Sequence, residues 1–496
     1  MVSSTSPRRW WALTALVLSV LVIGLDATIL NVALPTLAVD LGASTGELQW
    51  IVDAYLIPFA ALMLPAGALG DRFGRKRLLL AGLAVFGAAS ALATLAGGPA
   101  SLVAARVLLG VGAALVMPLS VSILPSLFAP HERAKAIAAW SAGMALGLPL
   151  GPIMGGYLLD RFWWGSIFLI NIPVVAVALV AAALLLPESR DERRPRVDLP
   201  GALLSVGGLT ALVYGVIEAP EAGWTSPPVL AALVSGLVLL GAFAAVEARS
   251  PAPMMDLRLF ADRVFLWGSI GATLVSLTLM GVLFVVPLHL QAVGGHDAFG
   301  TGLRVIPMVA GLMAGGLAGE KLLGRLDLRV LMPAGLTVLA AGLALGGLTG
   351  VSSGYGFTAA WLTVAGFGVG AAMVPAMDGV LAVLPEDRTG AGSGTLQTLR
   401  QVGGAFGVAG LGGLLTAVYT GGLPAGAPGA ARDSVAAAVR LGDPALAAAA
   451  REAFVAGMDA VLLVCAALAL AGAAATAVFM RAGEARESAH ELTSAR

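Results

Sequence analysis

Two acidic residues interrupt the apolar runs near the start of the sequence. Asp26 lies within GLDATILNVALP, in the run 10–39, and Asp53 lies in the next run, 49–69. An ionised side chain in the middle of a membrane helix costs about 3 kcal/mol on insertion scales, so such residues usually mark ion pathways. An acid in a site that opens alternately to the two sides of a membrane can bind a proton on one side and release it on the other. We therefore expect Asp26 and Asp53 to carry protons.

Arg106 is a third charged residue in an apolar run, about five residues inside the run 101–127. Buried charges in membranes usually find partners, so Arg106 is a candidate partner for Asp26. Two other interpretations stay open. Arg106 could extend its side chain to the membrane surface, and either aspartate could be held permanently in a structural hydrogen-bond network.

The runs that hold these residues belong to a strongly apolar chain, with 58% hydrophobic and 12% charged residues and a mean hydropathy of +0.92. A spanning helix needs roughly 20 apolar residues. The sequence therefore predicts an all-α integral membrane protein with fourteen transmembrane helices. The predicted spans are 10–39, 49–69, 78–96, 101–127, 136–159, 166–186, 199–217, 228–246, 264–293, 299–323, 330–348, 358–384, 395–419 and 455–480.

The positions of the 29 lysine and arginine residues predict the orientation. Most of them fall in segments that are cytoplasmic if the N-terminus is inside, as the positive-inside rule requires. We expect a multi-pass protein of the plasma membrane with both termini in the cytoplasm. A formal net charge of zero and the lack of a basic face with interleaved aromatics indicate no nucleic-acid partner.

The two halves of the chain carry similar marks 252 residues apart, because Pro35 matches Pro287 and Gly151 matches Gly403. Internal repeats of this kind are typical of transporters in which two bundles rock about a central site. We predict two six-helix bundles plus two extra linker helices, the seventh and eighth. The predicted parts are 1–190 for the N-terminal bundle, 191–262 for the linker and inserted helices, 263–482 for the C-terminal bundle and 483–496 for a cytoplasmic tail.

The alanine-rich segment 421–454 is polar enough to avoid the membrane, and we expect it outside. It could form short amphipathic helices over the exit, or it could be a flexible spacer.

The loop GDRFGRKR, residues 70–77, places five charges between two apolar runs. Positive-inside anchoring explains part of this loop, but an acid next to arginines also suits a latch of charge-assisted hydrogen bonds between bundles. With its flanking residues, the segment GALGDRFGRKR resembles the loop motif between the second and third helices of the major facilitator superfamily. The predicted latch residues are Gly70, Asp71, Arg72, Gly74 and Arg75.

Other segments resemble the fourteen-helix drug:proton antiporter branch of that superfamily: LDATILNVALP, WIVDAY at 50–55, RVLLGVGAAL at 106–115, GLPLGPIMGG at 147–156 and TLRQVGGAFG at 398–407. The resemblance implies the major facilitator fold and a proton-coupled exporter of drugs, dyes or antibiotics. It also implies that Arg106 lies near Asp26 and takes part in proton transfer.

The segment GLPLGPIMGG combines four glycines and two prolines within one predicted span. Ordinary close packing of membrane helices would explain it, whereas in the family this motif marks antiporters and implies export. The residues assigned to the motif are Gly147, Gly151, Pro152, Gly155 and Gly156.

The polar residues that we expect to line a central substrate cavity are Asn31, Tyr55, Gln397, Arg400 and Gln401. In some cation exporters of the resembled branch, acids occupy the positions that match the two glutamines. Their absence here argues against dicationic substrates and leaves neutral, singly charged or amphipathic ones.

These observations predict a monomeric transporter, not an enzyme, whose partners are a small-molecule substrate, protons and the lipid membrane. No nucleotide, metal or other cofactor is implied, since the sequence lacks a GxxxxGK[ST] loop. Three alternatives remain: a dedicated exporter of one endogenous product, a membrane sensor on a non-transporting scaffold, and a proton-coupled importer, which the resemblance of GLPLGPIMGG disfavours.

Overall fold

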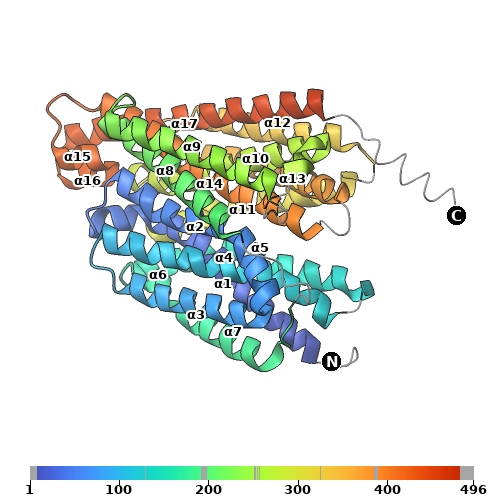
Figure 1. The fold of residues 1–496 in the computed structure, drawn as a ribbon. Coiled ribbons are helices and arrows are strands. Elements are labelled where there is room, and N and C mark those ends of the chain that lie inside the picture. The colour runs from blue at the N-terminus through green and yellow to red at the C-terminus, as the bar shows by residue number, and fades with distance from the viewer. Residues whose placement is uncertain are drawn as a thin grey trace.

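A computed structural model describes residues 8–128, 130–190, 198–250, 253, 255, 257–323, 325–384 and 389–480. Some side chains inside the helices, including that of Asp71, fall outside this description, as do the predicted tail 483–496 and most of the linker after residue 190. The described chain is built from helices joined by short turns (Figure 1). The start of the first described helix, at residue 8, and the end of the last, at residue 479, lie at the same end of the molecule (Figure 1).

The helices follow one another closely along the chain. In order they are α1 (Arg8–Asp40), α2 (Thr45–Phe73), α3 (Arg75–Thr94), α4 (Pro99–Leu127), α5 (Pro130–Arg161), α6 (Ser166–Leu169), α7 (Asn171–Leu185), α8 (Leu199–Ala222), α9 (Pro227–Arg249), the 3₁₀-helix η1 (Leu257–Ala261), α10 (Arg263–Leu288), the π-helix η2 (His289–Val293), α11 (Ala298–Leu323), α12 (Leu328–Gly346), α13 (Tyr355–Ala382), α14 (Thr389–Gly422), α15 (Gly429–Asp433), α16 (Val435–Arg440) and α17 (Pro444–Phe479).

Among the described residues, 12 helical segments are long and apolar enough to cross a membrane, with α6 joined to α7 and η2 joined to α10. The chain is therefore a multi-pass, all-helical membrane protein. The helices α2 and α5 are 29 and 32 residues long but are not among these 12, so the fourteen-span expectation is not confirmed in full.

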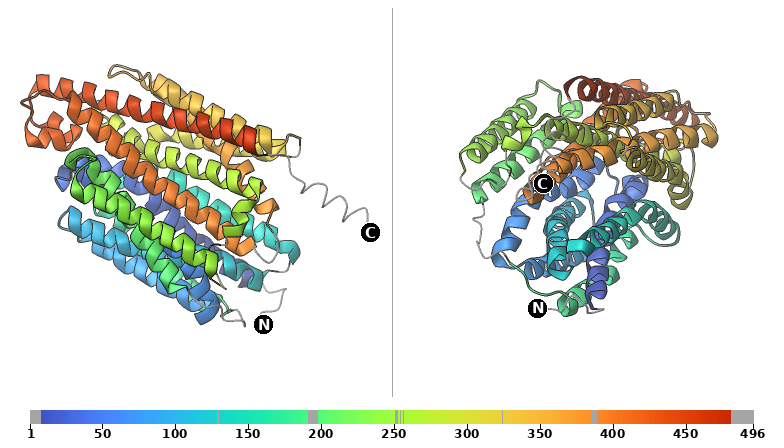
Figure 2. Two further views of the ribbon diagram at one scale, coloured as in Figure 1. Left: turned by 45° about the horizontal axis from the view of Figure 1, so that its top comes forward. Right: turned by 90° about the vertical axis from the view of Figure 1, so that its right-hand side faces the viewer.

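The long helices pack in two groups. In the first, α1 packs on α5 and α7, and α4 packs on α2 and α3; in the second, α13 packs on α11 and α12, and α14 packs on α10 and α17. The groups meet where α2 lies against α14 and where α5 lies against α11. We call these two contacts the α2–α14 seam and the α5–α11 seam. Figure 2 shows the groups from the end of the molecule, the first in blue to teal and the second in yellow to red.

The inserted helices lie beside the α2–α14 seam. Helix α8 packs against both α2 and α14, whereas α9 packs mainly on α8. The rings of Trp50 in α2 and Tyr214 in α8 are 6.1 Å apart. On the other group, a Cβ added at Gly413 of α14 would lie 3.1 Å from the Pro220 side chain of α8. The pair therefore covers one seam, in the green part of Figure 2.

Small residues of α5 allow close backbone contact with both of its neighbours. A Cβ added at Gly147 would lie 2.6 Å from the Leu25 nitrogen of α1, and one added at Gly156 would lie 2.6 Å from the Ala298 oxygen of α11. Contacts this close exclude any larger side chain unless a backbone moves. Glycine and other small residues serve the same purpose in membrane-helix packing generally.

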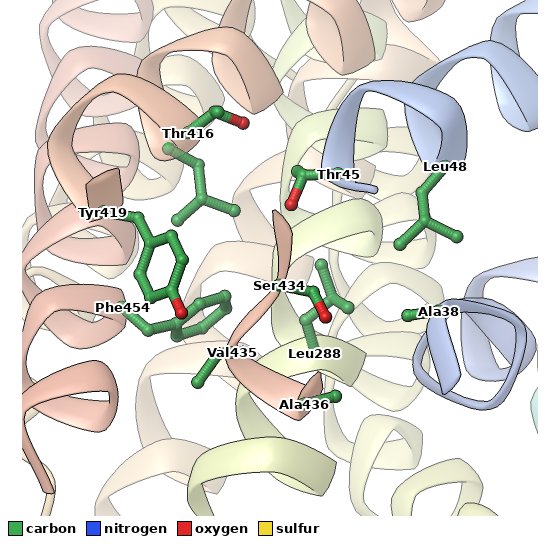
Figure 3. A pocket seen from close by; sticks show the side chains of 11 residues that line it. Ala38, Thr45, Leu48, Leu288, Thr416, Tyr419, Ser434, Val435, Ala436 and Phe454 are labelled. Carbon is green, nitrogen blue, oxygen red and sulfur yellow. The ribbon is translucent and has the colours of Figure 1, made fainter. Parts of the chain in front are cut away.

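The predicted outer segment 421–454 is shorter in the structure, because α14 continues to Gly422 and α17 already begins at Pro444. Asp443 caps the first turn of α17, and proline followed by alanines favours a helix start there. Between these helices, α15 and α16 lie at the end of the molecule opposite residues 8 and 479 (Figure 1). Ser434 and the start of α16 line a small pocket together with residues of α1, α2, α10, α14 and α17, among them Thr45, Tyr419 and Phe454 (Figure 3).

The contact between α3 and α4 gives a test of this packing. A Cβ added at Gly112 would lie 2.9 Å from the backbone of Gly82 and Phe86, whereas one added at Gly241 in α9 would meet nothing within 4 Å. Overpacking of this kind costs about 1–3 kcal/mol. We expect Gly112→Val to lower the thermal unfolding midpoint in detergent and Gly241→Val to leave it nearly unchanged. Equal midpoints for the two variants would contradict the packing described here.

Candidate functional site

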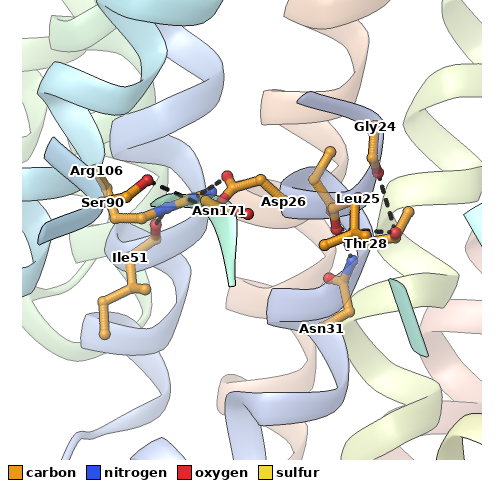
Figure 4. Close-up of polar contacts among 10 residues, drawn as sticks. Gly24, Leu25, Asp26, Thr28, Asn31, Ile51, Ser90, Arg106 and Asn171 are labelled. Atoms are coloured by element: carbon orange, nitrogen blue, oxygen red, sulfur yellow. Dashed lines mark hydrogen bonds and ion pairs between the residues drawn. The ribbon is translucent and has the colours of Figure 1, made fainter. Parts of the chain in front are cut away.

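Asp26 of α1 lies at the centre of a buried polar cluster and is 0% exposed. Its Oδ2 accepts a hydrogen bond from Nη1 of Arg106 in α4 over 2.6 Å, and its Oδ1 accepts one from Nδ2 of Asn171 in α7 over 2.9 Å. Nδ2 of Asn171 also lies 3.4 Å from Oγ of Ser90 in α3. Figure 4 shows these side chains converging from separate helices.

Arg106 makes two further contacts with α2. Its Nε donates to the backbone oxygen of Ile51 over 3.0 Å, and its guanidinium carbon lies 4.4 Å from the centre of the Tyr55 ring. Arg106 is 1% exposed, so it does not reach the membrane surface. The Asp26 carboxylate, the Ile51 carbonyl and the Tyr55 ring together hold this cation in one position, as a desolvated guanidinium requires.

The ion pair explains how two charges are tolerated in the apolar interior. The attraction between two charges is strong where water is excluded, but it offsets desolvation only when other hydrogen bonds satisfy both groups. Asn171 and the Ile51 carbonyl supply such bonds. Asp26 and Arg106 are therefore mutually dependent.

Below Asp26 on α1, polar side chains bond to nearby carbonyl groups. Thr28 donates to the oxygen of Gly147 in α5 over 2.9 Å, and Asn31 donates to the oxygen of Ala27 over 3.1 Å. Figure 4 shows Thr28 and Asn31 on the same helix as Asp26. A Cβ added at Gly151 would lie 2.9 Å from both the Thr28 Cβ and the Ile29 nitrogen. The motif of α5 thus packs directly on the segment of α1 that carries the cluster.

Asp53 lies between Ile51 and Tyr55 in the sequence of α2, but its environment differs from that of Asp26. It is 0% exposed, and neither of its carboxyl oxygens has a hydrogen-bond partner in the described structure. Residues 49, 53 and 56 share one face of α2 by helical spacing. Gln49 Nε2 reaches the Ala409 oxygen of α14 over 3.3 Å, and a Cβ added at Gly404 of α14 would lie 3.9 Å from Leu56. Asp53 therefore lies on the face that forms the α2–α14 seam.

On the other side of this seam, α14 carries the predicted cavity residues of the second group. Nη1 of Arg400 donates to Oε1 of Gln397 over 2.7 Å and lies 3.7 Å from the sulfur of Met377. Gln401 is half-buried on the same helix. The five predicted cavity residues therefore do not form one cluster: Tyr55 contacts Arg106, Asn31 stays on α1, and Gln397 pairs with Arg400.

The predicted latch residues surround the turn between α2 and α3. Gly74 has φ 113°, which favours glycine, and a Cβ there would lie 2.7 Å from the Glu188 carboxylate. Nη1 of Arg75 donates to the Ser122 oxygen of α4 over 2.9 Å, Gly70 is buried against Leu119 of α4, and Arg72 is exposed beside Phe73. These contacts lie within the first group of helices. The side chain of Asp71 is outside the described part of the structure, so its role stays a prediction.

The sequence analysis assigned no role to three polar residues that make contacts between helices in the structure. The signal for Asn171 was its position as a polar residue near the start of the apolar run 166–186, within INIP. Gln49 and Gln291 each reach from one group of helices to the other, since Gln291 Nε2 donates to the Val32 oxygen over 2.8 Å. Amide side chains are neutral and common near helix ends, so the sequence does not show which of them bond to another helix. Their hydrogen-bond partners in the structure do.

A family model described as Major Facilitator Superfamily matches residues 16–408. The chain belongs to the major facilitator superfamily. It is therefore a transporter rather than an enzyme, and the resemblance noted in the loop at residues 70–77 is confirmed at the level of the family.

Several characterised relatives are resistance and export proteins. The chain is 37% identical to the multidrug efflux pump LfrA of Mycolicibacterium smegmatis, with 96% of this chain and 97% of that protein covered. It is 36% identical to the puromycin resistance protein Pur8 of Streptomyces alboniger, with 84% and 82% covered. These relatives agree with the expected class of drug and antibiotic efflux transporters.

Solved structures agree with the fold. A bacterial homolog of the human lysosomal transporter Spinster superposes with a TM-score of 0.68 at 20% identity, covering 97% of this chain and all of that chain. The POT family transporter PepTSo gives a TM-score of 0.66 at 16% identity, covering 96% of this chain and 98% of that chain. At these identities the likeness concerns the fold alone.

The buried ion pair predicts how the stability of this protein changes on substitution of Asp26. Removing one partner of a buried pair leaves the other charge uncompensated, at a cost of about 3–5 kcal/mol. We expect Asp26→Leu to lower the thermal unfolding midpoint strongly, and the double variant Asp26→Leu with Arg106→Met to recover most of the loss. A double variant that is less stable than the single one would show that the two charges do not depend on each other.

Proposed function

We propose that this protein is a proton-coupled antiporter that exports small, largely apolar or amphipathic compounds by alternating access. The observation that carries the proposal is the contrast between its two buried acids. Asp26 has a cation and an amide as partners, whereas Asp53 is buried without any partner in the described structure. One site thus suits a carboxylate and the other suits a neutral acid, because burying an unpaired charge is costly.

In the proposed cycle, Asp53 exchanges the proton at the α2–α14 seam. Protonated Asp53 lets the seam pack as observed, while loss of the proton would place an uncompensated charge between the groups of helices and favour their separation. Asp26 is held as a carboxylate by Arg106 until the groups move. The proton moving inward across a potential of about 100 mV supplies about 2.3 kcal/mol, plus its concentration term, which drives the substrate outward.

The substrate class follows from the relatives and from the α14 residues. LfrA is a multidrug efflux pump and Pur8 a puromycin resistance protein. We propose drugs, dyes and antibiotics as substrates, held between the two groups of helices by apolar surface with Asn31, Tyr55, Gln397, Arg400 and Gln401. With glutamines at 397 and 401, we expect poor transport of dications.

A second candidate function is dedicated export of one endogenous product. It is favoured by the 34% identity to the tetracenomycin C resistance and export protein of Streptomyces glaucescens, with 82% of this chain covered. Transport competition among unrelated dyes separates the two candidates, since a dedicated exporter would not be inhibited by most of them.

We also propose a topology of fourteen spans in the plasma membrane, with α2 and α5 crossing alongside the other 12 segments. Helix α2 packs between α4, α8 and α14, and α5 packs between α1 and α11, so both are surrounded by helices that meet the criterion. Both termini would be cytoplasmic and the protein would act as a monomer. The proposed bundles are 1–190 and 263–482, with 191–262 inserted between them.

Dye efflux under an imposed pH gradient tests the coupling. We expect Asp53→Asn to bind substrate but to lose proton-driven efflux, because an amide keeps the neutral seam and cannot release a proton. Asp26→Asn should also lose it, since Arg106 would remain unpaired. Asp378→Asn, an exposed acid of α13, is the matched control and should transport normally. Undiminished gradient-driven efflux in the Asp53 and Asp26 variants would overturn the proposal.

The latch role of the loop at residues 70–77 is tested separately. We expect Asp71→Asn to slow efflux while leaving substrate affinity within about two-fold, because the loop lies away from the proposed binding region. Lys76→Gln is the control, since its Nζ donates to the Ala183 oxygen of the same group of helices. Loss of binding with an unchanged cycle rate would argue against a latch.

A further inference from the structure

The two groups of helices are tied together at one end of the molecule, where α1 ends and α2, α11 and α17 begin. We call it the distal end. Among the described residues, hydrogen bonds of four side chains cross between the groups at or near this end. Gln291 donates to the Val32 oxygen, Thr45 donates to the Asp433 oxygen, Gln49 donates to the Ala409 oxygen, and Asp160 of α5 accepts two bonds from the start of α11. Of these four side chains, only Asp160 is acidic or basic.

Asp160 caps a helix that belongs to the other group. Its Oδ1 accepts from the backbone N–H of Ala298 over 3.2 Å, and its Oδ2 accepts from that of Phe299 over 3.1 Å. The next N–H, of Gly300, is capped over 2.7 Å by Asp297, the residue that precedes α11. A helix start leaves such donors without partners of its own. The capping of α11 is therefore divided between its own chain segment and α5.

Asp160 is disfavoured by the end of its own helix and is stabilised by its contact with α11. It lies in the last turn of α5, where the negative end of its own helix dipole disfavours an acid, and it meets the positive end of α11. Pro152, Gly156 and Asp160 are spaced by four residues and share one face. Along that face the Pro152 carbonyl contacts Gly302, and a Cβ at Gly156 would lie 2.8 Å from the Phe299 nitrogen. Backbone contact at the seam thus aims the carboxylate at α11.

Asp160 is also exposed, so water can replace its partners when the groups separate. We propose that Asp160 is a carboxylate latch that holds the distal end closed against the N-terminus of α11 and opens once in each transport cycle. This inference rests on the proposed alternating access, but it concerns the opening at the distal end and not the proton that drives it.

Distances between spin labels at the distal end test the latch. Ala100 and Ser352 are exposed in the two groups, at the start of α4 and between α12 and α13. The labelled background is Ala100→Cys with Ser352→Cys and Cys465→Ala, reconstituted in lipid nanodiscs without substrate or pH gradient. An acid at a helix N-terminus contributes a modest stabilisation, so we expect Asp160→Asn to raise the ratio of long to short distances about two- to five-fold. Asp160→Glu should shift it less.

Asp443→Asn is the matched control. Asp443 caps α17 at the same end, with Oδ1 accepting from Ala445 and Leu446 over 2.9 and 3.3 Å, but within its own helix. It should leave the distances unchanged. The latch is overturned if Asp160→Asn gives the parental distances, or if Asp443→Asn shifts them equally. Because no gradient is applied, failure here is separate from a failure of proton coupling, which the efflux of Asp53→Asn reports.

Discussion

The ion pair between Asp26 and Arg106 is the interaction around which the first group of helices is arranged. An isolated charge in this interior would be strongly destabilising, so each partner must be supplied with hydrogen bonds at a fixed place. Those bonds come from α7, through Asn171, and from α2, through the Ile51 carbonyl, while the Tyr55 ring covers the guanidinium. Four helices are thereby held in register about one carboxylate.

Asp53 shows the other way in which an acid can be accommodated in an apolar environment. No described residue donates a hydrogen bond to it, and burying an ionised carboxylate without such bonds is costly. Asp53 lies at the contact between the two groups of helices, since the face of α2 that it shares with Gln49 and Leu56 packs on α14. A change of charge at this point would be felt by the contact between the two groups of helices, and not only within α2.

The two seams between the groups of helices differ in how their helices pack. At the α5–α11 seam, glycines bring backbones together without interlocking side chains, so the contact can separate and re-form without repacking large groups. The α2–α14 seam differs because α8 packs across it. The proposed alternating access would therefore carry α8 along with one of the two groups or slide it over the other.

The sequence by itself determined the membrane class, the approximate positions of the helices, the family and the three charged residues of the first group. Hydropathy and charge burial act along the chain, so a lone acid such as Asp26 stands out in an apolar run without reference to any partner. The start of α17 was placed too late, at 455, because the alanine-rich residues from Pro444 onward are weakly hydrophobic yet strongly helix-forming.

Only the tertiary structure decided which groups meet. Arg106 and Asn171 lie 80 and 145 residues from Asp26 in the chain, and their contact depends on how separate helices are rotated and tilted. The same reason explains why Asp53 has no hydrogen-bond partner among the described residues, why Arg400 pairs with Gln397, and why Asp160 caps α11 instead of facing solvent alone. Helical period places a side chain on a face of its own helix, but the neighbour of that face is chosen by the packing of the whole molecule.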